Sequence, residues 1–196
     1  GCLENTMVGN DRSGTVDDNL NLLKAVELTL TGGFDLNPVV DALTGKPEKP
    51  RRDGEDTGDP AAFTAWEQFW EAYARQTRYI IRKSVETYER SEEIRARYFQ
   101  TPYVSCLVKG CAESGKDINE GGAELGFGTI EGVTYATTVD SLLAVKYLVY
   151  DKHICTMNEL VQALRDNWAG HVKLQAIALH KAPKYGRDDD YADAMA

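Results

Sequence analysis

Two residues near the start of the sequence have side chains that could perform chemistry together. Cys2 carries a thiol and Glu4 a carboxylate, within the run G-C-L-E, and the Gly, Asn, Asp, Ser and Thr residues that follow up to residue 18 predict a loop. On a loop tip, both side chains can face one bound molecule. Taken alone, such a pair is usually incidental. A cysteine protease would also need a histidine with an orienting partner, and His153, His171 and His180 carry no such signature.

A glycine-rich segment, residues 110–128, is the second candidate. It reads GCAESGKDINEGGAELGFG and has six glycines. A segment of this length and composition is either disordered or functional. Gly121, Gly122 and Glu124 lie within it. From the residues alone, Glu124 is an acid on a surface loop or a helix cap. No phosphate-binding G-x-x-x-x-G-K-[ST] motif occurs.

The hydrophobic pattern predicts helices and strands that would position these residues. Helical periodicity or capping signals predict helices over 19–31, 61–90, 92–99, 139–150, 156–168 and 170–181, and the start of another near 188. Alternation of apolar and polar residues predicts strands over 102–110 and 132–138. Residues 34–60, with four prolines and many charges, predict a surface excursion. Strands alternating with helices indicate an α/β fold.

Composition excludes several classes of protein. The chain has 196 residues and a net charge of −9, which disfavours nucleic-acid and anionic-membrane surfaces, and no apolar run is long enough for a membrane span. The four cysteines form no CxxC pair, so neither a zinc site nor a disulfide framework is expected. Cys106 and Cys111 are interpreted as structural. Reduced thiols and the absence of a signal peptide indicate the cytoplasm.

An aromatic stripe runs along the helix predicted over 61–90. Its members recur at helical spacing: Phe63, Trp66, Trp70, Tyr73, Thr77, Ile80, Ser84 and Tyr88. Such a stripe normally faces a core. A different reading is that the chain is a non-catalytic, acidic helical module that binds a partner through exposed tryptophans.

Three separated motifs resemble glycyl radical enzymes, the pyruvate formate-lyase-like superfamily. They are the opening GCLE with the helix NLLKAVELTLTGG, the segment SCLVKGCAESGKDINEGGAEL, and GVTYATTVDSLLAVKYLVYD. The resemblance implies that residues 1–196 are an internal part of the catalytic domain and contribute to a ten-stranded barrel with surrounding helices. The N-terminal half-barrel would precede Gly1, and the glycyl radical motif would follow Ala196.

The resemblance also implies a mechanism. Cys2 would form the thiyl radical that takes hydrogen from a small organic substrate, and Glu4 would act as a base or a hydrogen-bond acceptor; the alternative is that Glu4 only orders the loop. Gly121, Gly122 and Glu124 would contribute to substrate binding. No cofactor would be bound. A glycyl radical outside this chain would be installed by a radical S-adenosylmethionine iron–sulfur activase, under anaerobic conditions. The full-length enzyme would be a homodimer.

The motif residues discriminate among the reactions of the superfamily. Acyl transfer uses two adjacent cysteines, whereas Gly1 precedes Cys2; aryl- and alkylsuccinate synthases generally lack the acid two residues on. Dehydratases usually have proline where Asn5 stands and a basic residue where Glu124 stands. Two carboxyls in one apolar cavity would supply one proton donor and one acceptor. These differences favour an arylacetate decarboxylase-like lyase, and the alternative is a dehydratase of a diol or hydroxyproline.

Overall fold

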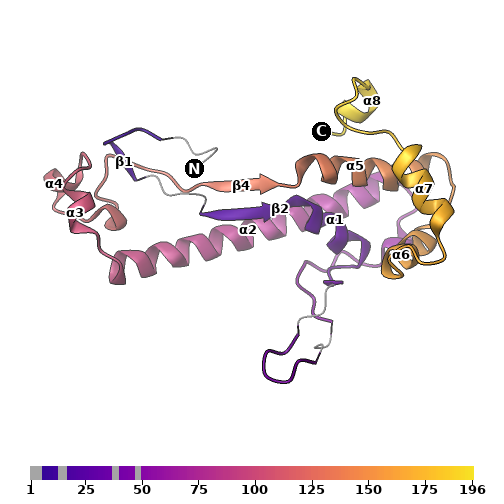
Figure 1. Ribbon diagram of the computed structural model, residues 1–196, viewed down its shortest axis with the longest axis horizontal. Helices are drawn as coiled ribbons and strands as arrows, with labels where there is room; N and C mark the ends of the chain where they lie inside the picture. The colour runs from indigo at the N-terminus through magenta and orange to yellow at the C-terminus, as the bar shows by residue number, and fades with distance from the viewer. Residues whose placement is uncertain (1–5, 13–16, 37–39, 47–49) are drawn as a thin grey trace. The chain divides into compact units, whose positions relative to one another are not determined.

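The computed structural model describes residues 6–12, 17–36, 40–46 and 50–196 (Figure 1). Cys2 and Glu4 lie outside the described residues. The chain divides into two compact units: unit 1 comprises Gly1–Leu20 and Ile81–Val133, and unit 2 comprises Asn21–Ile80 and Thr134–Ala196. The longest helix, α2 (Trp66–Tyr98), contributes to both units, because the boundary falls within it.

Unit 2 is built from helices around one apolar core. Its elements are α1 (Leu22–Leu30), the 3₁₀ helix η1 (Pro60–Ala62), the first half of α2, α5 (Tyr135–Val145), the π-helix η3 (Lys146–Asp151), α6 (Met157–Arg165), α7 (Val172–His180) and α8 (Asp190–Asp193). The core gathers Val26 and Leu30 of α1, Phe69 of α2, Leu142 of α5 and Leu160 of α6. Helix amphipathicity therefore determines this unit, as the periodicity predicted.

The buried face of α2 differs from the predicted stripe. Phe69 and Gln76 are fully buried, whereas Trp66 is half-buried and Trp70 is 39% exposed. The buried face of α2 is therefore centred on Phe69 and Gln76, one position before the predicted Trp70 and Thr77, and Trp70 lies at its edge. Trp66 stacks on Phe69 with ring centroids 5.5 Å apart and meets Tyr150 edge-on. The aromatic stripe packs as part of a core, but less completely than predicted.

Unit 1 contains the described strands and the glycine-rich segment. The strands are β1 (Asp11–Arg12), β2 (Asp18–Asn21), β3 (Leu125–Gly126) and β4 (Ile130–Val133). β1 pairs in parallel with β3, so that Asp11 faces Leu125 and Arg12 faces Gly126, and β2 pairs with β4. Two short helices and a 3₁₀ turn lie between α2 and β3 in the sequence: α3 (Pro102–Ser105), α4 (Cys111–Ser114) and η2 (Ile118–Glu120). Helices together with parallel pairing confirm the α/β class.

Both predicted strands need correction. Residues 102–110 form α3 and a turn instead of a strand, because Pro102 occupies the first helical turn, where its fixed φ favours a helix. In 132–138, only Gly132 and Val133 belong to a strand, and α5 begins at Tyr135. Thr137 and Thr138 lie in α5, where Thr138 Oγ1 donates to the carbonyl of Thr134, the N-cap of the helix, at 2.8 Å.

Two predicted helices are one. The helices expected over 61–90 and 92–99 join into the 33-residue α2, since no glycine or proline interrupts it. The helix expected over 139–150 begins earlier and ends as the π-helix η3. The helices at 19–31, 156–168 and 170–181 correspond to α1, α6 and α7.

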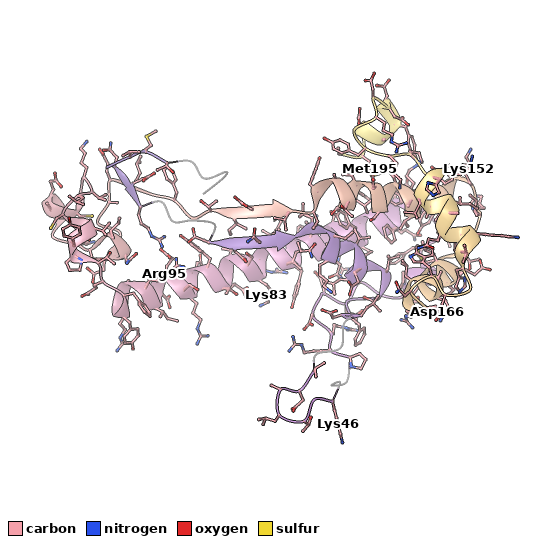
Figure 2. The ribbon with its side chains drawn as sticks, in the orientation of Figure 1. Lys46, Lys83, Arg95, Lys152, Asp166 and Met195 are labelled. Carbon is pink, nitrogen blue, oxygen red and sulfur yellow. The ribbon has the colours of Figure 1, made fainter. Side chains whose placement is uncertain are left out.

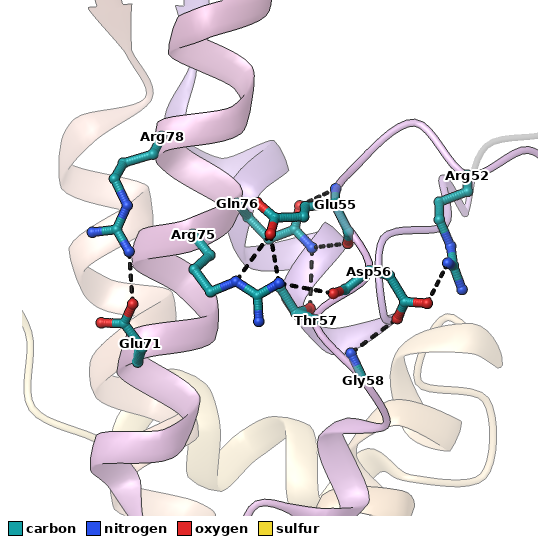
Figure 3. A network of polar contacts seen from close by, with 9 residues as sticks. All are labelled: Arg52, Glu55, Asp56, Thr57, Gly58, Glu71, Arg75, Gln76 and Arg78. Atoms are coloured by element: carbon teal, nitrogen blue, oxygen red, sulfur yellow. Dashed lines mark hydrogen bonds and ion pairs between the residues drawn. The ribbon is translucent and has the colours of Figure 1, made fainter.

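Part of the predicted surface excursion is anchored in unit 2. Gln76 of α2 accepts from Glu55 N at 3.0 Å and donates to Glu55 O at 2.7 Å and to Thr57 Oγ1 at 3.1 Å (Figure 3). Arg75 adds bonds to the Glu55 carboxylate and the Asp56 carbonyl. Residues 55–57 are therefore held by a buried polar side chain. The charged composition of this segment gave no indication of that contact. Among the described residues, no helix combines the length and apolarity that a membrane span requires.

Candidate functional site

Residues 9–12 lie against the glycine-rich segment. Lys109 N donates to Gly9 O at 2.7 Å, Leu125 N to Asn10 O at 3.1 Å, and Phe127 N to Arg12 O at 3.4 Å. These backbone bonds extend the β1–β3 pairing on both sides. The structure therefore brings residues 9–12 and the glycine-rich segment together. Cys2 and Glu4 lie outside the described residues, so their placement beside this segment stays a prediction.

Side chains reinforce this junction. Asp11 is 6% exposed and accepts from Met7 N at 2.6 Å, which closes the turn before β1. Arg12 donates to Tyr88 Oη at 3.0 Å and pairs with the Glu92 carboxylate at 2.7 Å, so that β1 is tied to α2. Arg95 of α2, labelled in Figure 2, bridges Glu92 and the nearly buried carboxylate of Asp17. The ion pairs fix the strands of unit 1 on this helix.

The glycine-rich segment needs glycine for close approach at two positions. A Cβ on Gly122 would lie 2.2 Å from Lys116 O, and one on Gly110 would lie 2.7 Å from Glu124 N. Gly110 also has a φ of 95°, which L-residues rarely adopt. Gly122 is buried and Gly121 is exposed. The segment is thus a compactly folded loop in which the glycine positions are set by backbone contact.

Glu124 lies in an exposed ion pair. Its carboxylate is 3.0 Å from Lys109 Nζ, and its backbone N donates to Lys109 O at 2.9 Å. The side chain is 44% exposed. Within the described part of the chain, the Glu124 carboxylate therefore has a cationic partner.

The described cysteines differ in their environment. Burial, with the nearby charges of Asp117 and Glu113, raises the pKa of the Cys111 thiol, and burial raises the pKa of Cys155 to about 11. Both thiols stay protonated at neutral pH, which suits packing rather than nucleophilic attack. Cys106, predicted to lie within a strand, is exposed after α3. No group of three or more His, Cys, Asp or Glu side chains in the described ranges could hold a metal ion.

Sequence reasoning missed Asp117 as an organising residue of the glycine-rich segment. Asp117 and Glu120 form a reciprocal cap on η2: the Asp117 side chain accepts from Asn119 N at 2.9 Å, and Glu120 accepts from Asp117 N at 3.2 Å. The available signal was the spacing D-x-x-E, which is typical of a capping box.

Comparisons with known proteins identify the family of this chain and several relatives. The family model described as "Pyruvate formate lyase-like" matches residues 1–196. Trans-4-hydroxy-L-proline dehydratase of Clostridioides difficile is 36% identical over 195 residues, covering 100% of this chain and 23% of the relative. Isethionate sulfite-lyase of Oleidesulfovibrio alaskensis is 33% identical, with the same coverage of both chains.

Solved structures agree in fold. The hydroxyproline dehydratase of C. difficile with its substrate bound gives a TM-score of 0.82 over 95% of this chain and 22% of that one. The B12-independent glycerol dehydratase of Clostridium butyricum gives 0.81 at 30% identity, with the same coverage. This chain is thus a mixed α/β segment that spans less than a quarter of these proteins.

The relatives named here are dehydratases and a sulfite-lyase, and none of them is an arylacetate decarboxylase, which was the branch that the sequence favoured. The family itself agrees with the motifs. The chain belongs to the pyruvate formate lyase-like family of glycyl radical enzymes.

Proposed function

We propose that this chain is part of a glycyl radical dehydratase that removes water from a small hydroxylated substrate of the hydroxyproline or diol type. The observation that carries the proposal is the 36% identity to trans-4-hydroxy-L-proline dehydratase along the whole chain. The G-C-x-E run at residues 1–4 supports it, because a thiol and an acid at that spacing are what such a reaction uses.

In this proposal, Cys2 and Glu4 divide the chemistry. The glycyl radical, carried outside this chain and installed by the activase, supplies the unpaired electron that makes Cys2 competent to exchange a hydrogen atom. Cys2 takes a hydrogen atom from the substrate carbon next to the one that bears the departing hydroxyl, and in a diol Glu4 accepts the proton of the hydroxyl that is retained. The C–O bond of the departing hydroxyl then breaks, the proton held on the acid leaves with it as water, and Cys2 returns the hydrogen atom to the product.

The ion pair of Glu124 favours dehydration over decarboxylation. A decarboxylase with two carboxylates would use the repulsion between Glu4 and Glu124 in one dry cavity to separate their pKa values. The Glu124 carboxylate has Lys109 as a cationic partner 3.0 Å away, which favours its ionised form. Gly121, Gly122 and Glu124 stay in the proposal as substrate-binding residues through backbone and ion-pair geometry, with no proton-transfer role.

A second candidate is cleavage of a C–S bond. Isethionate sulfite-lyase is 33% identical along this chain, and it begins from a hydroxylated substrate as well. The same hydrogen exchange at Cys2 would then release sulfite in place of water. The full-length protein is proposed to act in the anaerobic cytoplasm as a homodimer, with the small-molecule substrate and the activating enzyme as its partners.

The test uses the full-length enzyme activated anaerobically. Wild type is offered trans-4-hydroxy-L-proline, a 1,2-diol, isethionate and hydroxyphenylacetate, and the radical is quantified by electron spin resonance. We expect elimination of water from one of the first two. Cys2→Ser should abolish turnover and leave the glycyl radical signal intact. Glu4→Gln should slow turnover by roughly 10²–10⁴, the usual contribution of a positioned base.

Glu124→Gln is the discriminating variant. A dehydratase that relies on Glu4 should keep most of its kcat in this variant, whereas a two-carboxylate decarboxylase should lose it. Sulfite release from isethionate, without dehydration of the other substrates, would promote the second candidate. Consumption of hydroxyphenylacetate alone would overturn both.

A further inference from the structure

Asp117 connects two stretches of unit 1 through its carboxylate. One oxygen accepts from Asn119 N at 2.9 Å, within the glycine-rich segment. The other accepts from Thr101 N at 2.8 Å and from Ser105 Oγ at 2.9 Å, at the start and the end of α3. A single side chain thus binds three donors across the gap between residues 101–105 and 117–119.

Ser105 makes the connection reciprocal. Ser105 is only 8% exposed, and its Oγ accepts a hydrogen bond from Ile118 N at 2.9 Å. Asn119 adds a third link, since its Nδ2 donates to Phe99 O at 2.7 Å. The turn at 117–119 is therefore fastened to the end of α2 and to α3 at several points, and the carboxylate of Asp117 is the group that most of these bonds share.

The backbone of Asp117 is hydrogen-bonded to one of the residues proposed to bind substrate. Gly122 N donates to Asp117 O at 3.0 Å, and the Gly122 Cα lies so close to Lys116 that no side chain fits. Two residues later, Glu124 pairs with Lys109 through backbone and side chain. The path of residues 121–124 therefore depends on where Asp117 is held.

The hydrogen bonds keep the carboxylate ionised. Burial acts to raise the pKa of Asp117, but the bonds from Asn119, Ser105 and Thr101 outweigh burial and lower the pKa below its ordinary value. A negative charge with fixed donors is a stiff anchor, because hydrogen bonds to a charged group are stronger than those between neutral groups.

We propose that Asp117 is a positioning residue, which holds Gly121, Gly122 and Glu124 in the arrangement that binds substrate. This inference rests on the proposed function for the role of residues 121–124. It adds a residue that contacts no substrate and acts through the backbone of the turn at 117–122.

The test compares Asp117→Asn with wild type in the full-length, activated enzyme. The amide keeps the shape, but its NH₂ cannot accept from the donors it faces. We expect KM to rise by about tenfold or more, since each hydrogen bond to a charged group is worth that ratio. The kcat and the radical content should change much less. Ser105→Ala should raise KM in the same direction, and the double variant should add little, as expected for groups in one network.

Asp151→Asn is the matched control. Asp151 is also a carboxylate in a polar network, since it pairs with Lys146 at 2.9 Å and accepts from Tyr191 Oη. It belongs to unit 2 and makes none of these bonds to the glycine-rich segment, so its loss should lower thermal stability without raising KM. An active wild type with unchanged KM in Asp117→Asn would overturn the inference and leave the proposed function intact.

Hydrogen exchange supplies a measurement that needs no turnover. The Gly122 amide should exchange faster in Asp117→Asn than in wild type or Asp151→Asn, because its acceptor is the Asp117 carbonyl. Unchanged protection of that amide would overturn the positioning role even if no substrate were found. Failure of wild type on every substrate, with Gly122 deprotected as expected, would instead contradict the proposed function.

Discussion

At the scale of single residues, Gln76 shows how a buried polar group organises a charged loop. Its side chain is fully buried and its amide is satisfied by three bonds, two to the backbone of Glu55 and one to Thr57 (Figure 3). The side-chain amide of Gln76 bonds to both the N–H and the C=O of Glu55, as the backbone of a neighbouring strand would. Buried polar groups of this kind stabilise one conformation because any other would leave them unpaired.

Gln76→Leu is expected to release residues 55–57. The substitution is close in volume but leaves the Glu55 N–H and C=O without partners, at a cost of about 1–3 kcal/mol for unmet bonds. Hydrogen exchange in the full-length protein should show faster exchange of the Glu55 amide. Gln162→Leu is the control, since Gln162 is exposed and bonds only to Asp166 on the same helix. Equal exchange in both variants would contradict the anchoring role.

The capping box of α6 gives a prediction about pH. Thr156 N donates to Glu159 Oε2 at 2.7 Å, and Glu159 N donates to Thr156 Oγ1 at 3.2 Å. The bonds that the Glu159 carboxylate accepts from the N–H and the hydroxyl of Thr156 lower the pKa of Glu159 below its ordinary value of 4.5. A carboxyl with a lowered pKa in the folded state stabilises the fold above its unfolded pKa and loses that contribution as pH falls through the folded pKa.

Glu159→Gln should therefore lower the Tm at neutral pH, and the difference from wild type should shrink as the pH falls below 4.5. The measurement is the Tm of both proteins across the acidic range. Glu67→Gln, on the exposed first turn of α2, is a control for the general loss of one charge. A difference that stays constant with pH would mean that the carboxylate does not cap α6.

At the scale of elements, the glycine-rich segment has a fixed path because backbone contacts leave no room for side chains. Lys116 O occupies the space where a Cβ of Gly122 would lie. The same segment contains α4, η2 and β3, each only a few residues long. Elements this short are not stable alone, so the capping bonds and the pairing of β3 with β1 maintain them.

Gly122→Ala should disrupt this segment. A Cβ 2.2 Å from Lys116 O forces the backbone to shift, and such overpacking typically costs about 1–3 kcal/mol or more. Gly126→Ala is the matched control, because a Cβ there meets nothing within 4 Å. We expect a lower Tm and a raised KM for Gly122→Ala alone. Equal Tm values for the two variants would contradict the close approach.

At the scale of the whole molecule, the large apolar core belongs to unit 2, while the candidate substrate-binding residues belong to unit 1. The chain spans less than a quarter of the relatives that it matches. The exposed Trp70 is at the edge of the unit 2 core, so its exposure alone does not favour a partner-binding module over an enzyme. The match of the family to all 196 residues favours the enzyme.

The isolated chain is expected to be catalytically inert. If the radical glycine and part of the substrate cavity lie in other regions of the full-length enzyme, residues 1–196 cannot start the hydrogen exchange at Cys2. The measurement is product formation by the purified chain with activase and each candidate substrate, with the full-length enzyme as the positive control. Turnover by the chain alone would contradict the proposal that it is one part of a larger catalytic domain.

The sequence by itself determined the features that depend on local patterns. Helical periodicity and capping signals located α1, α6 and α7, and three short motifs identified the family. In α6 the capping signal is the spacing T-x-x-E, and Thr156 and Glu159 form the reciprocal cap there. These succeed because hydrophobic spacing and capping act within a few residues of the chain. The motif at Cys2 and Glu4 stays a prediction, since both lie outside the described residues.

Only the tertiary structure decided the features that depend on distant partners. Residues 102–110 alternate like a strand, yet Ser105 is held in α3 by Asp117, twelve positions away along the chain. Glu124 was expected as a second acid near the substrate cavity, which stays a prediction, and the structure adds Lys109 as its ion-pair partner fifteen positions earlier in the chain. Gln76 was not expected to be buried, and its bonds to Glu55 and Thr57 satisfy it there. In each case, the decisive energy comes from a partner far along the chain, which no local pattern specifies.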